Sequence, residues 1–220
     1  MIRNLFPTPL GVYFIDRSII REARANILNY LDQSCKDPEE FFRSVGQNYQ
    51  FSIAQNFCKS SNYLTYQTYD DLKYFETFKP LVDSVCENIE RYFKETEIEV
   101  EDYEITSMWA NVYKPGGDNS EHTHPNSFLS GVVYIEDDSQ ETLKFFDPRV
   151  QNYVMVPKGI SPYYERVHSG EYGTGVNLVF PSWLQHRPQP YTGPSQYRIT
   201  LAYNVMLRGE AGYWGYHVRY

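Results

Sequence analysis

The sequence predicts an α+β protein in which N-terminal helices pack against a β jelly roll, and two observations indicate this. Apolar residues recur at helical spacing within residues 1–100. From residue 103 the pattern changes to short apolar runs separated by turn residues, which is typical of an antiparallel sandwich or barrel. No long helical pattern interrupts these runs, which disfavours a parallel α/β fold. We therefore expect one domain over residues 1–220, with a mainly helical support region at 1–100 and a jelly-roll core at 103–220.

Two segments of the first half have helical periodicity. In the first segment apolar residues recur from Ile19 to Leu31, and Asp16 or Ser18 can cap its N-terminus. The second segment is expected from about residue 69 to 94, with Pro80 as a break or a first-turn residue. Between them residues 44–64 are polar and poorly periodic, so we expect a loop with one short strand at most.

The second half contains the predicted strands. Their apolar runs are Ile105–Tyr113, Gly131–Ile135, Leu143–Phe146, Tyr153–Val156, Val176–Phe180 and Arg198–Val205. Because side chains alternate along a strand, the last run places Arg198 on one face with Thr200, Ala202 and Asn204, and an apolar set on the other. An arginine among small residues fits the inside of a barrel that holds a ligand, and the apolar face is the one that helices would cover.

Composition limits the partners and the compartment. A formal charge of −8 and a pI near 5.2 argue against nucleic acid as the main partner. The chain has no apolar stretch long enough for a signal peptide or a membrane span. Its three cysteines show no zinc-binding spacing, so reduced thiols in the cytoplasm are expected. A homodimer is left open.

The most informative pattern is His122-Thr-His124 followed by His186 and then Arg198. Two histidines at i and i+2 of an extended segment point to the same face, and His186 completes a metal site if the fold brings it beside them. Imidazole binds Fe, Zn, Cu and Ni well, and three such ligands leave positions open for other molecules. A metal beside a buried arginine is typical of a non-haem iron enzyme that binds a small dicarboxylic co-substrate.

The residues around this pattern resemble the 2-oxoglutarate- and Fe(II)-dependent oxygenases of the double-stranded β-helix superfamily. The likeness extends from Trp109 to Asn204 and, more weakly, to the N-terminus. The sequence is similar in particular to a group of these oxygenases from bacteria and phages, whose signature is His-x-His-Pro followed by Ser-Gly-Val-x-Tyr. The matching segments are His122-Thr-His124-Pro125, Ser130-Gly131-Val132-Val133-Tyr134, Leu178–His186, Arg198–Asn204 and Leu5–Leu10.

The resemblance implies an activity and a role for each site residue. The enzyme would consume O₂ and 2-oxoglutarate, release succinate and CO₂, and hydroxylate an unidentified substrate. His122 and His186 would be iron ligands, and Arg198 would pair with the distal carboxylate of 2-oxoglutarate. Tyr134 would donate a hydrogen bond to the same carboxylate, and Tyr113 would contact the co-substrate near the iron.

Position 124 departs from the wider superfamily, in which most members place a carboxylate two residues after the first histidine. Here His124 occupies that place, and we expect His122, His124 and His186 to be the ligands. Asn126 or a water molecule remains an alternative third ligand. The nearby carboxylates of Asp118 and Glu121 have unsuitable spacing from His122.

Two other functions remain open at this point. A three-histidine cupin-type dioxygenase without 2-oxoglutarate explains His124 but gives Arg198 and Tyr134 no purpose. A non-catalytic jelly-roll module would use its metal only as a structural staple. Such a site is normally closed by four ligands, whereas the sequence offers three.

Overall fold

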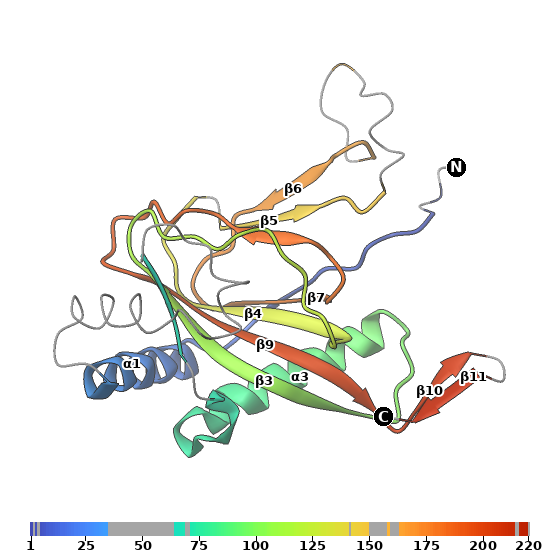
Figure 1. Ribbon diagram of the computed structural model, residues 1–220, viewed down its shortest axis with the longest axis horizontal. Helices are drawn as coiled ribbons and strands as arrows, with labels where there is room; N and C mark the ends of the chain where they lie inside the picture. The colour runs from blue at the N-terminus through green and yellow to red at the C-terminus, as the bar shows by residue number, and fades with distance from the viewer. Residues whose placement is uncertain are drawn as a thin grey trace.

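The computed structural model describes residues 1, 3, 5–34, 64–68, 71–140, 142–149, 158, 163–213 and 216–219. Their strands form two antiparallel sheets and a separate hairpin (Figure 1). The large sheet has the order β1 (Gly11–Phe14), β7 (Val176–Pro181), β4 (Leu129–Glu136), β9 (Arg198–Arg208), β3 (Asp102–Tyr113) and β2 (Thr65–Gln67). The small sheet has the order β6 (Val167–Gly170), β5 (Leu143–Phe146) and β8 (His186–Pro188), and the hairpin joins β10 (Glu210–Tyr213) to β11 (Tyr216–Arg219).

Two helices, α1 (Arg17–Ser34) and α3 (Lys79–Glu95), lie along one face of the large sheet, and the small sheet lies on its other side (Figure 1). The helices and the large sheet share one hydrophobic core, which includes Ile27 of α1, Ile89 of α3 and Leu201 of β9. A second apolar cluster between the two sheets includes Phe145 and Phe180. This arrangement is the predicted jelly roll with supporting helices.

The first helix forms where the periodicity predicts it. Asp16 precedes it, and its Oδ1 accepts the backbone N–H of Ser18 at 2.7 Å, which satisfies one of the donors that a helix N-terminus leaves free. Ile20, Ala23 and Ile27 are buried along one face, as i, i+3, i+4 spacing requires.

The second helical segment is shorter than predicted. Two 3₁₀ turns, η3 (Leu72–Tyr74) and η4 (Glu76–Phe78), come first, and α3 begins only at Lys79. Pro80 lies in the first turn of α3, where its missing N–H costs no hydrogen bond. Phe75 has extended backbone angles (φ −89°, ψ 122°) and separates the two 3₁₀ turns.

Two strands of the large sheet were not predicted. β1 and β2 are edge strands of four and three residues, too short to show the alternation that identifies a strand. The expected loop at 44–64 lies outside the described residues except for Leu64, and the predicted strand at Tyr153–Val156 lies outside them as well.

Strand β9 confirms the predicted division between its two faces. Ile199, Leu201, Tyr203 and Val205 are fully buried in the core that the helices cover. The opposite face contributes Arg198, Thr200, Ala202 and Asn204 to a cavity between the two sheets. The position of Arg198 inside the barrel therefore follows from strand alternation.

Gly131 of β4 lies under the ring of Tyr203, its partner on β9. A Cβ at Gly131 would come within 2.1 Å of the ring, and the ring is held in place because its hydroxyl donates to Asn177 Oδ1 at 2.9 Å. We expect Gly131→Ala to lower the free energy of unfolding by about 2–3 kcal/mol through overpacking, measured by urea denaturation. Gly173→Ala is the matched control, because nothing lies within 4 Å of the added methyl group; equal effects of the two substitutions would contradict this account.

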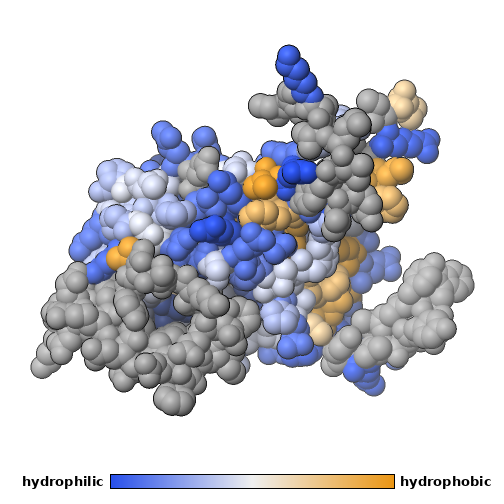
Figure 2. Space-filling model, turned by 45° about the horizontal axis from the view of Figure 1, so that its top comes forward, coloured by the Kyte–Doolittle hydropathy of each residue, from blue (hydrophilic) through white to orange (hydrophobic). Residues whose placement is uncertain are grey.

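The surface carries both polar and apolar areas. In Figure 2 hydrophilic residues cover the upper left and the centre of the face, and apolar residues gather to the right of the centre. The most exposed apolar side chains include Leu5, Phe6 and Phe14. Within the described part of the chain, no helix combines the length and the apolar character needed to cross a bilayer.

Candidate metal centre

Three histidines meet at one end of the cavity, where the loop after β3 crosses the start of β8. His122 and His186 exchange two backbone hydrogen bonds, N–H to O at 3.0 Å in each direction. The N–H of His124 donates to the carbonyl of Ser182 at 3.0 Å. These main-chain bonds place residues that are distant in sequence beside one another.

The three rings face a common point. Their centroids lie 4.4–5.1 Å apart, and their candidate ligand atoms all lie within 4.8 Å of one another. The Nε2 atoms of His124 and His186 are 3.3 Å apart. Two nitrogens bound to one ion at about 2.1 Å would be about 3.0 Å apart at a right angle and about 3.4 Å apart at a tetrahedral angle. The spacing therefore fits two ligands of one metal ion.

Main-chain acceptors orient two of the rings. Nδ1 of His122 lies 2.7 Å from the carbonyl oxygen of Ser120, and Nδ1 of His186 lies 2.8 Å from that of Leu184. A carbonyl can only accept, so each Nδ1 carries the proton and donates it. Each Nε2 then has a free lone pair, which is the arrangement that metal-binding histidines usually adopt.

Burial keeps all three rings neutral. Desolvation lowers the pKa of His122, lowers that of His124 to about 4, and lowers that of His186 well below its ordinary value. For His124 and His186 the mutual repulsion of the three imidazolium charges adds to this effect. A neutral imidazole is the form that binds a metal.

These pKa shifts predict how the stability of the metal-free protein depends on pH. Because the folded-state pKa values lie below 6.5, the unfolded chain binds protons first as the pH falls. The stabilisation is complete above pH 6.5 and is lost as the pH falls toward 4, at up to about 1.4 kcal/mol per pH unit for each histidine. Urea denaturation between pH 7.5 and 5 measures this dependence. His124→Leu should make it shallower, and an unchanged slope would contradict the assignment.

Arg198 lies in the same cavity, fully buried. Its Nη2 donates to the carbonyl of Gln189 at 2.6 Å, and its guanidinium lies 4.2 Å from the ring centre of Tyr113. Nε is 4.0 Å from Asp137 Oδ2, and neither Nε nor Nη1 has a hydrogen-bond partner among the described residues. A buried cation with unused donors is costly, so this side chain has the capacity to bind an anion.

The two predicted tyrosines flank Arg198 in different ways. Tyr134 of β4 is buried and lines the cavity, and burial raises the pKa of its phenol, so that its hydroxyl stays protonated and can donate. Tyr113 places its ring against the guanidinium, and its hydroxyl accepts a hydrogen bond from Asn119 Nδ2 at 3.1 Å. Tyr113 therefore supports Arg198 directly, which the sequence did not indicate.

The cavity has a volume of about 350 Å³. Trp109 and Asn111 also line it, and neither was predicted. Both share the inward face of β3 with Tyr113, so strand alternation could have identified them. Asn111 Oδ1 is buried and has no hydrogen-bond partner among the described residues.

The nearby carboxylates of Asp118 and Glu121 do not join the histidine cluster. Asp118 forms an ion pair with Arg187 at 2.8 Å, and Glu121 is exposed. Asn126 has a left-handed backbone (φ 57°). Among the described residues, the three histidines form the only group of three or more His, Cys, Asp or Glu side chains suited to a metal. Three neutral nitrogen donors with an open side suit Fe(II).

Fold and site together define a class: a jelly roll whose cavity holds three convergent imidazoles at one end and a buried arginine within reach. Residues 107–204 match the family described as "Putative 2OG-Fe(II) oxygenase". This matched segment contains His122, His124, His186 and Arg198. No curated protein matches the chain.

Solved structures share the fold along most of the chain. A prolyl-4-hydroxylase from Pseudomonas putida superposes with a TM-score of 0.55 at 15% identity, covering 92% of this chain and 94% of its own. HygX from Streptomyces hygroscopicus, solved with nickel and 2-oxoglutarate bound, gives 0.54 at 10% identity and covers 90% and 82%. SnoN, a non-haem α-ketoglutarate-dependent epimerase from nogalamycin biosynthesis, gives 0.55 at 10% identity and covers 89% and 76%. These likenesses confirm the predicted double-stranded β-helix.

Proposed function

We propose that the chain hydroxylates an unidentified substrate, with Fe(II) held by His122, His124 and His186 and with 2-oxoglutarate held by Arg198. The observation that carries this proposal concerns Arg198: two of its guanidinium nitrogens have no hydrogen-bond partner among the described residues, and they lie in the cavity that the three imidazoles also line. A metal site alone needs no buried cation. A co-substrate that binds the metal at one end and carries a carboxylate at the other explains why the cavity contains both a metal site and a buried arginine.

The contacts of Arg198 fit a carboxylate of the co-substrate better than a structural role. Asp137, the nearest carboxylate, is 4.0 Å away and makes no hydrogen bond with the guanidinium. Burial also raises the pKa of Asp137 and so weakens its charge. The distal carboxylate of 2-oxoglutarate would accept from Nη1, which has no hydrogen-bond partner among the described residues, and the hydroxyl of Tyr134, which lines the same cavity, would donate to it as well.

Fe(II), when bound, supplies the activation of O₂ that no side chain can provide. The residues of this chain would bind the metal, orient the co-substrate and keep water out of the cavity. The three histidines would hold the metal at the wall of the cavity, and Arg198 in the same cavity would bind and orient the co-substrate. Trp109 of β3, whose ring centre is 6.0 Å from that of His124, would help to exclude water from the bound metal.

We propose His124 as the third ligand in place of the usual carboxylate, which makes the site one charge unit more positive. The distance of 3.3 Å between His124 Nε2 and His186 Nε2 supports this choice over Asn126 or water. The His-x-His-Pro signature supports membership of the bacterial and phage group that the chain resembles.

The two alternatives make different use of the cavity. A cupin-type dioxygenase would leave Arg198 without an anion, and a structural staple would require a closed metal site. Three ligands beside a cavity of about 350 Å³ favour an enzyme that admits other molecules.

The decisive experiment is an anaerobic titration. We expect the protein with Fe(II) and 2-oxoglutarate to develop the visible charge-transfer band of a 2-oxoglutarate chelate, and His186→Ala to abolish it. Bound iron with no band would favour the cupin-type alternative. A band that persists in His124→Ala while disappearing in His186→Ala would remove His124 from the ligand set.

We also propose a single functional domain, because the N-terminal helices and the large sheet share one core. Cys86 is a free thiol, which supports a cytoplasmic location. A homodimer and the lack of a nucleic-acid partner remain predictions that sedimentation and nucleic-acid binding assays test.

A further inference from the structure

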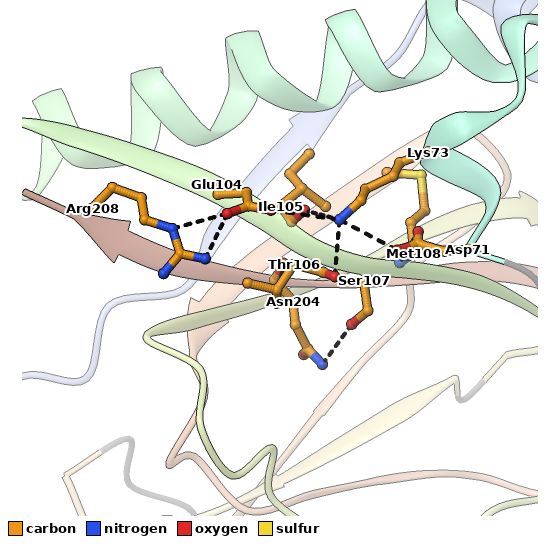
Figure 3. Close-up of polar contacts among 9 residues, drawn as sticks. All are labelled: Asp71, Lys73, Glu104, Ile105, Thr106, Ser107, Met108, Asn204 and Arg208. Atoms are coloured by element: carbon orange, nitrogen blue, oxygen red, sulfur yellow. Dashed lines mark hydrogen bonds and ion pairs between the residues drawn. The ribbon is translucent and has the colours of Figure 1, made fainter. Parts of the chain in front are cut away.

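Lys73 shows how this fold satisfies a cation that it buries. Its side chain is 10% exposed, and its Nζ donates to the carbonyls of Ile105 and Thr106 at 2.6 and 2.9 Å (Figure 3). The carboxylate of Asp71 lies 3.3 Å from the same nitrogen, and that of Glu104 lies 3.9 Å from it. A charge removed from water needs such a set of oxygen partners.

Arg198 is more deeply buried than Lys73 and has fewer partners. Its side chain is 1% exposed, and its Nη2 donates to the carbonyl of Gln189 at 2.6 Å. Nε and Nη1 have no hydrogen-bond partner in the part of the chain that the structure describes. The rings of Tyr113 and Tyr191 lie against the guanidinium, with centres 4.2 and 5.8 Å from its carbon, but neither carries a negative charge.

The carboxylate that faces Arg198 belongs to Asp137, the residue after β4. Its Oδ2 lies 4.0 Å from Arg198 Nε, and its side chain is fully buried. Oδ1 accepts the backbone N–H and the hydroxyl of Ser139 at 2.8 and 2.6 Å, whereas Oδ2 has no hydrogen-bond partner among the described residues. Asp137 does not line the cavity, so it approaches Arg198 from outside the space that a co-substrate would occupy.

The other titratable groups around Asp137 do not take over this role. Oδ1 of the adjacent Asp138 accepts from the hydroxyl of Tyr191 at 2.7 Å. Burial raises the pKa of the Tyr191 phenol and of the Tyr134 phenol, so both stay neutral. Among the groups that the structure describes around Asp137, Arg198 supplies the positive charge.

The charges of Arg198 and Asp137 balance while the cavity holds no other anion, because an arginine keeps its proton. A bound co-substrate brings a second carboxylate to the same guanidinium, which leaves one buried negative charge in excess. Such a charge is costly and is normally neutralised by protonation. Burial already raises the pKa of Asp137, although the hydrogen bonds from Ser139 and the charge of Arg198 act against that shift. Asp137 is therefore the group that can respond.

We propose that Asp137 is the internal counter-ion of Arg198 and takes up one proton when the distal carboxylate of 2-oxoglutarate binds. The proton moves from solvent to Oδ2, and the negative charge beside Arg198 then comes from the co-substrate. Asp137 is a positioning residue whose charge competes with the co-substrate, so the affinity falls as the pH rises. The inference rests on the proposed role of Arg198 and adds a pH-dependent control to that same site.

The test is the number of protons taken up when 2-oxoglutarate binds to the Ni(II)-loaded protein. Calorimetry in buffers of different ionisation enthalpy measures this number between about pH 6.5 and 9. We expect uptake to approach one proton per site within this range, where the dissociation constant should rise by up to about tenfold per pH unit. The three histidines should not contribute, because their lowered pKa values keep them neutral above pH 6.5.

Asp137→Asn removes the titratable group and keeps an oxygen that can accept from Ser139. We expect this variant to take up no proton and to bind 2-oxoglutarate with a dissociation constant that does not change with pH. Asp71→Asn is the matched control, because it removes the carboxylate beside the buried Lys73, outside the cavity, and should keep the proton uptake of the wild type.

Two further measurements cover the case in which Asp137→Asn folds poorly. Ser139→Ala removes a hydroxyl that stabilises the anion of Asp137, so it should move the pH range of proton uptake upward. Infrared difference spectra of the wild type and of Asp71→Asn should gain the C=O stretch of a buried carboxylic acid when 2-oxoglutarate binds.

The outcomes distinguish this inference from the function on which it rests. Wild-type protein that binds no 2-oxoglutarate would contradict the proposed function and the inference together. Binding without proton uptake across the whole range, uptake that persists in Asp137→Asn, an equal loss of uptake in Asp71→Asn, or an unchanged range in Ser139→Ala would contradict the inference alone.

Discussion

Replacing His186 by alanine is expected to abolish both metal binding and 2-oxoglutarate turnover, with a loss of activity of roughly a thousandfold or more. His186 is buried, and its ring lies within 5.1 Å of both other histidines, centroid to centroid. It is also the one histidine of the three that the β8 side of the barrel contributes. Without it the remaining two imidazoles, those of His122 and His124, both come from the loop between β3 and β4, and the ion has no ligand from the small sheet.

The measurements are Co(II) affinity and succinate production from 2-oxoglutarate. His168→Ala is the matched control, because His168 is an exposed histidine of β6 whose ring interacts with Glu165 and Tyr172, outside the cavity of the three histidines. It should retain normal affinity. Thermal denaturation of the metal-free variants shows whether folding is intact, and a His186→Ala protein that folds and binds Co(II) normally would exclude His186 as a ligand.

The second large effect is expected at Arg198. Arg198→Leu should raise the KM for 2-oxoglutarate on the order of 30- to 5000-fold, because losing one partner of a buried, hydrogen-bonded charge pair costs about 2–5 kcal/mol. Arg198→Lys keeps the charge but not the planar set of donors, so its KM should lie between the two. It also provides a readout should the leucine variant fold poorly.

The co-substrate itself supplies the sharper comparison. 2-Oxopentanoate has the keto acid group of 2-oxoglutarate but lacks the distal carboxylate. It should bind the wild type far more weakly than 2-oxoglutarate does, and Arg198→Leu should bind the two almost equally. Arg187→Ala, which removes a half-exposed arginine paired with Asp118 outside the cavity, is the control. If Arg198→Leu still preferred 2-oxoglutarate, another residue would hold the carboxylate.

Sequence alone predicted the features that depend on local periodicity. The inward position of Arg198 followed from alternation along β9, and the first helix followed from i, i+3, i+4 spacing after Asp16. The same rule, applied to β3, would have found Trp109 and Asn111. Periodicity failed at β1 and β2, where edge strands of four and three residues give too few alternations to recognise.

Features that depend on contacts between distant segments could be predicted only in part. Nothing in the spacing of His122 and His186 specifies the reciprocal backbone hydrogen bonds that join them. The contact of Tyr113 with Arg198 depends on the pairing of β3 with β9. Asn204 could not be linked to Ser107 from sequence, because a bulge shifts the register between Ile105 and Ser107.

The backbone pairing of His122 with His186 also bears on how an ion enters and leaves. Since His122 lies in the loop between β3 and β4, and His186 begins β8, an ion held by both would fasten the two layers of the barrel together. Release would then require the layers to separate locally, or one imidazole to swing away against its hydrogen bond to a carbonyl. Exchange with free metal would be governed by the opening rate of the barrel wall and not by the strength of the coordinate bonds alone.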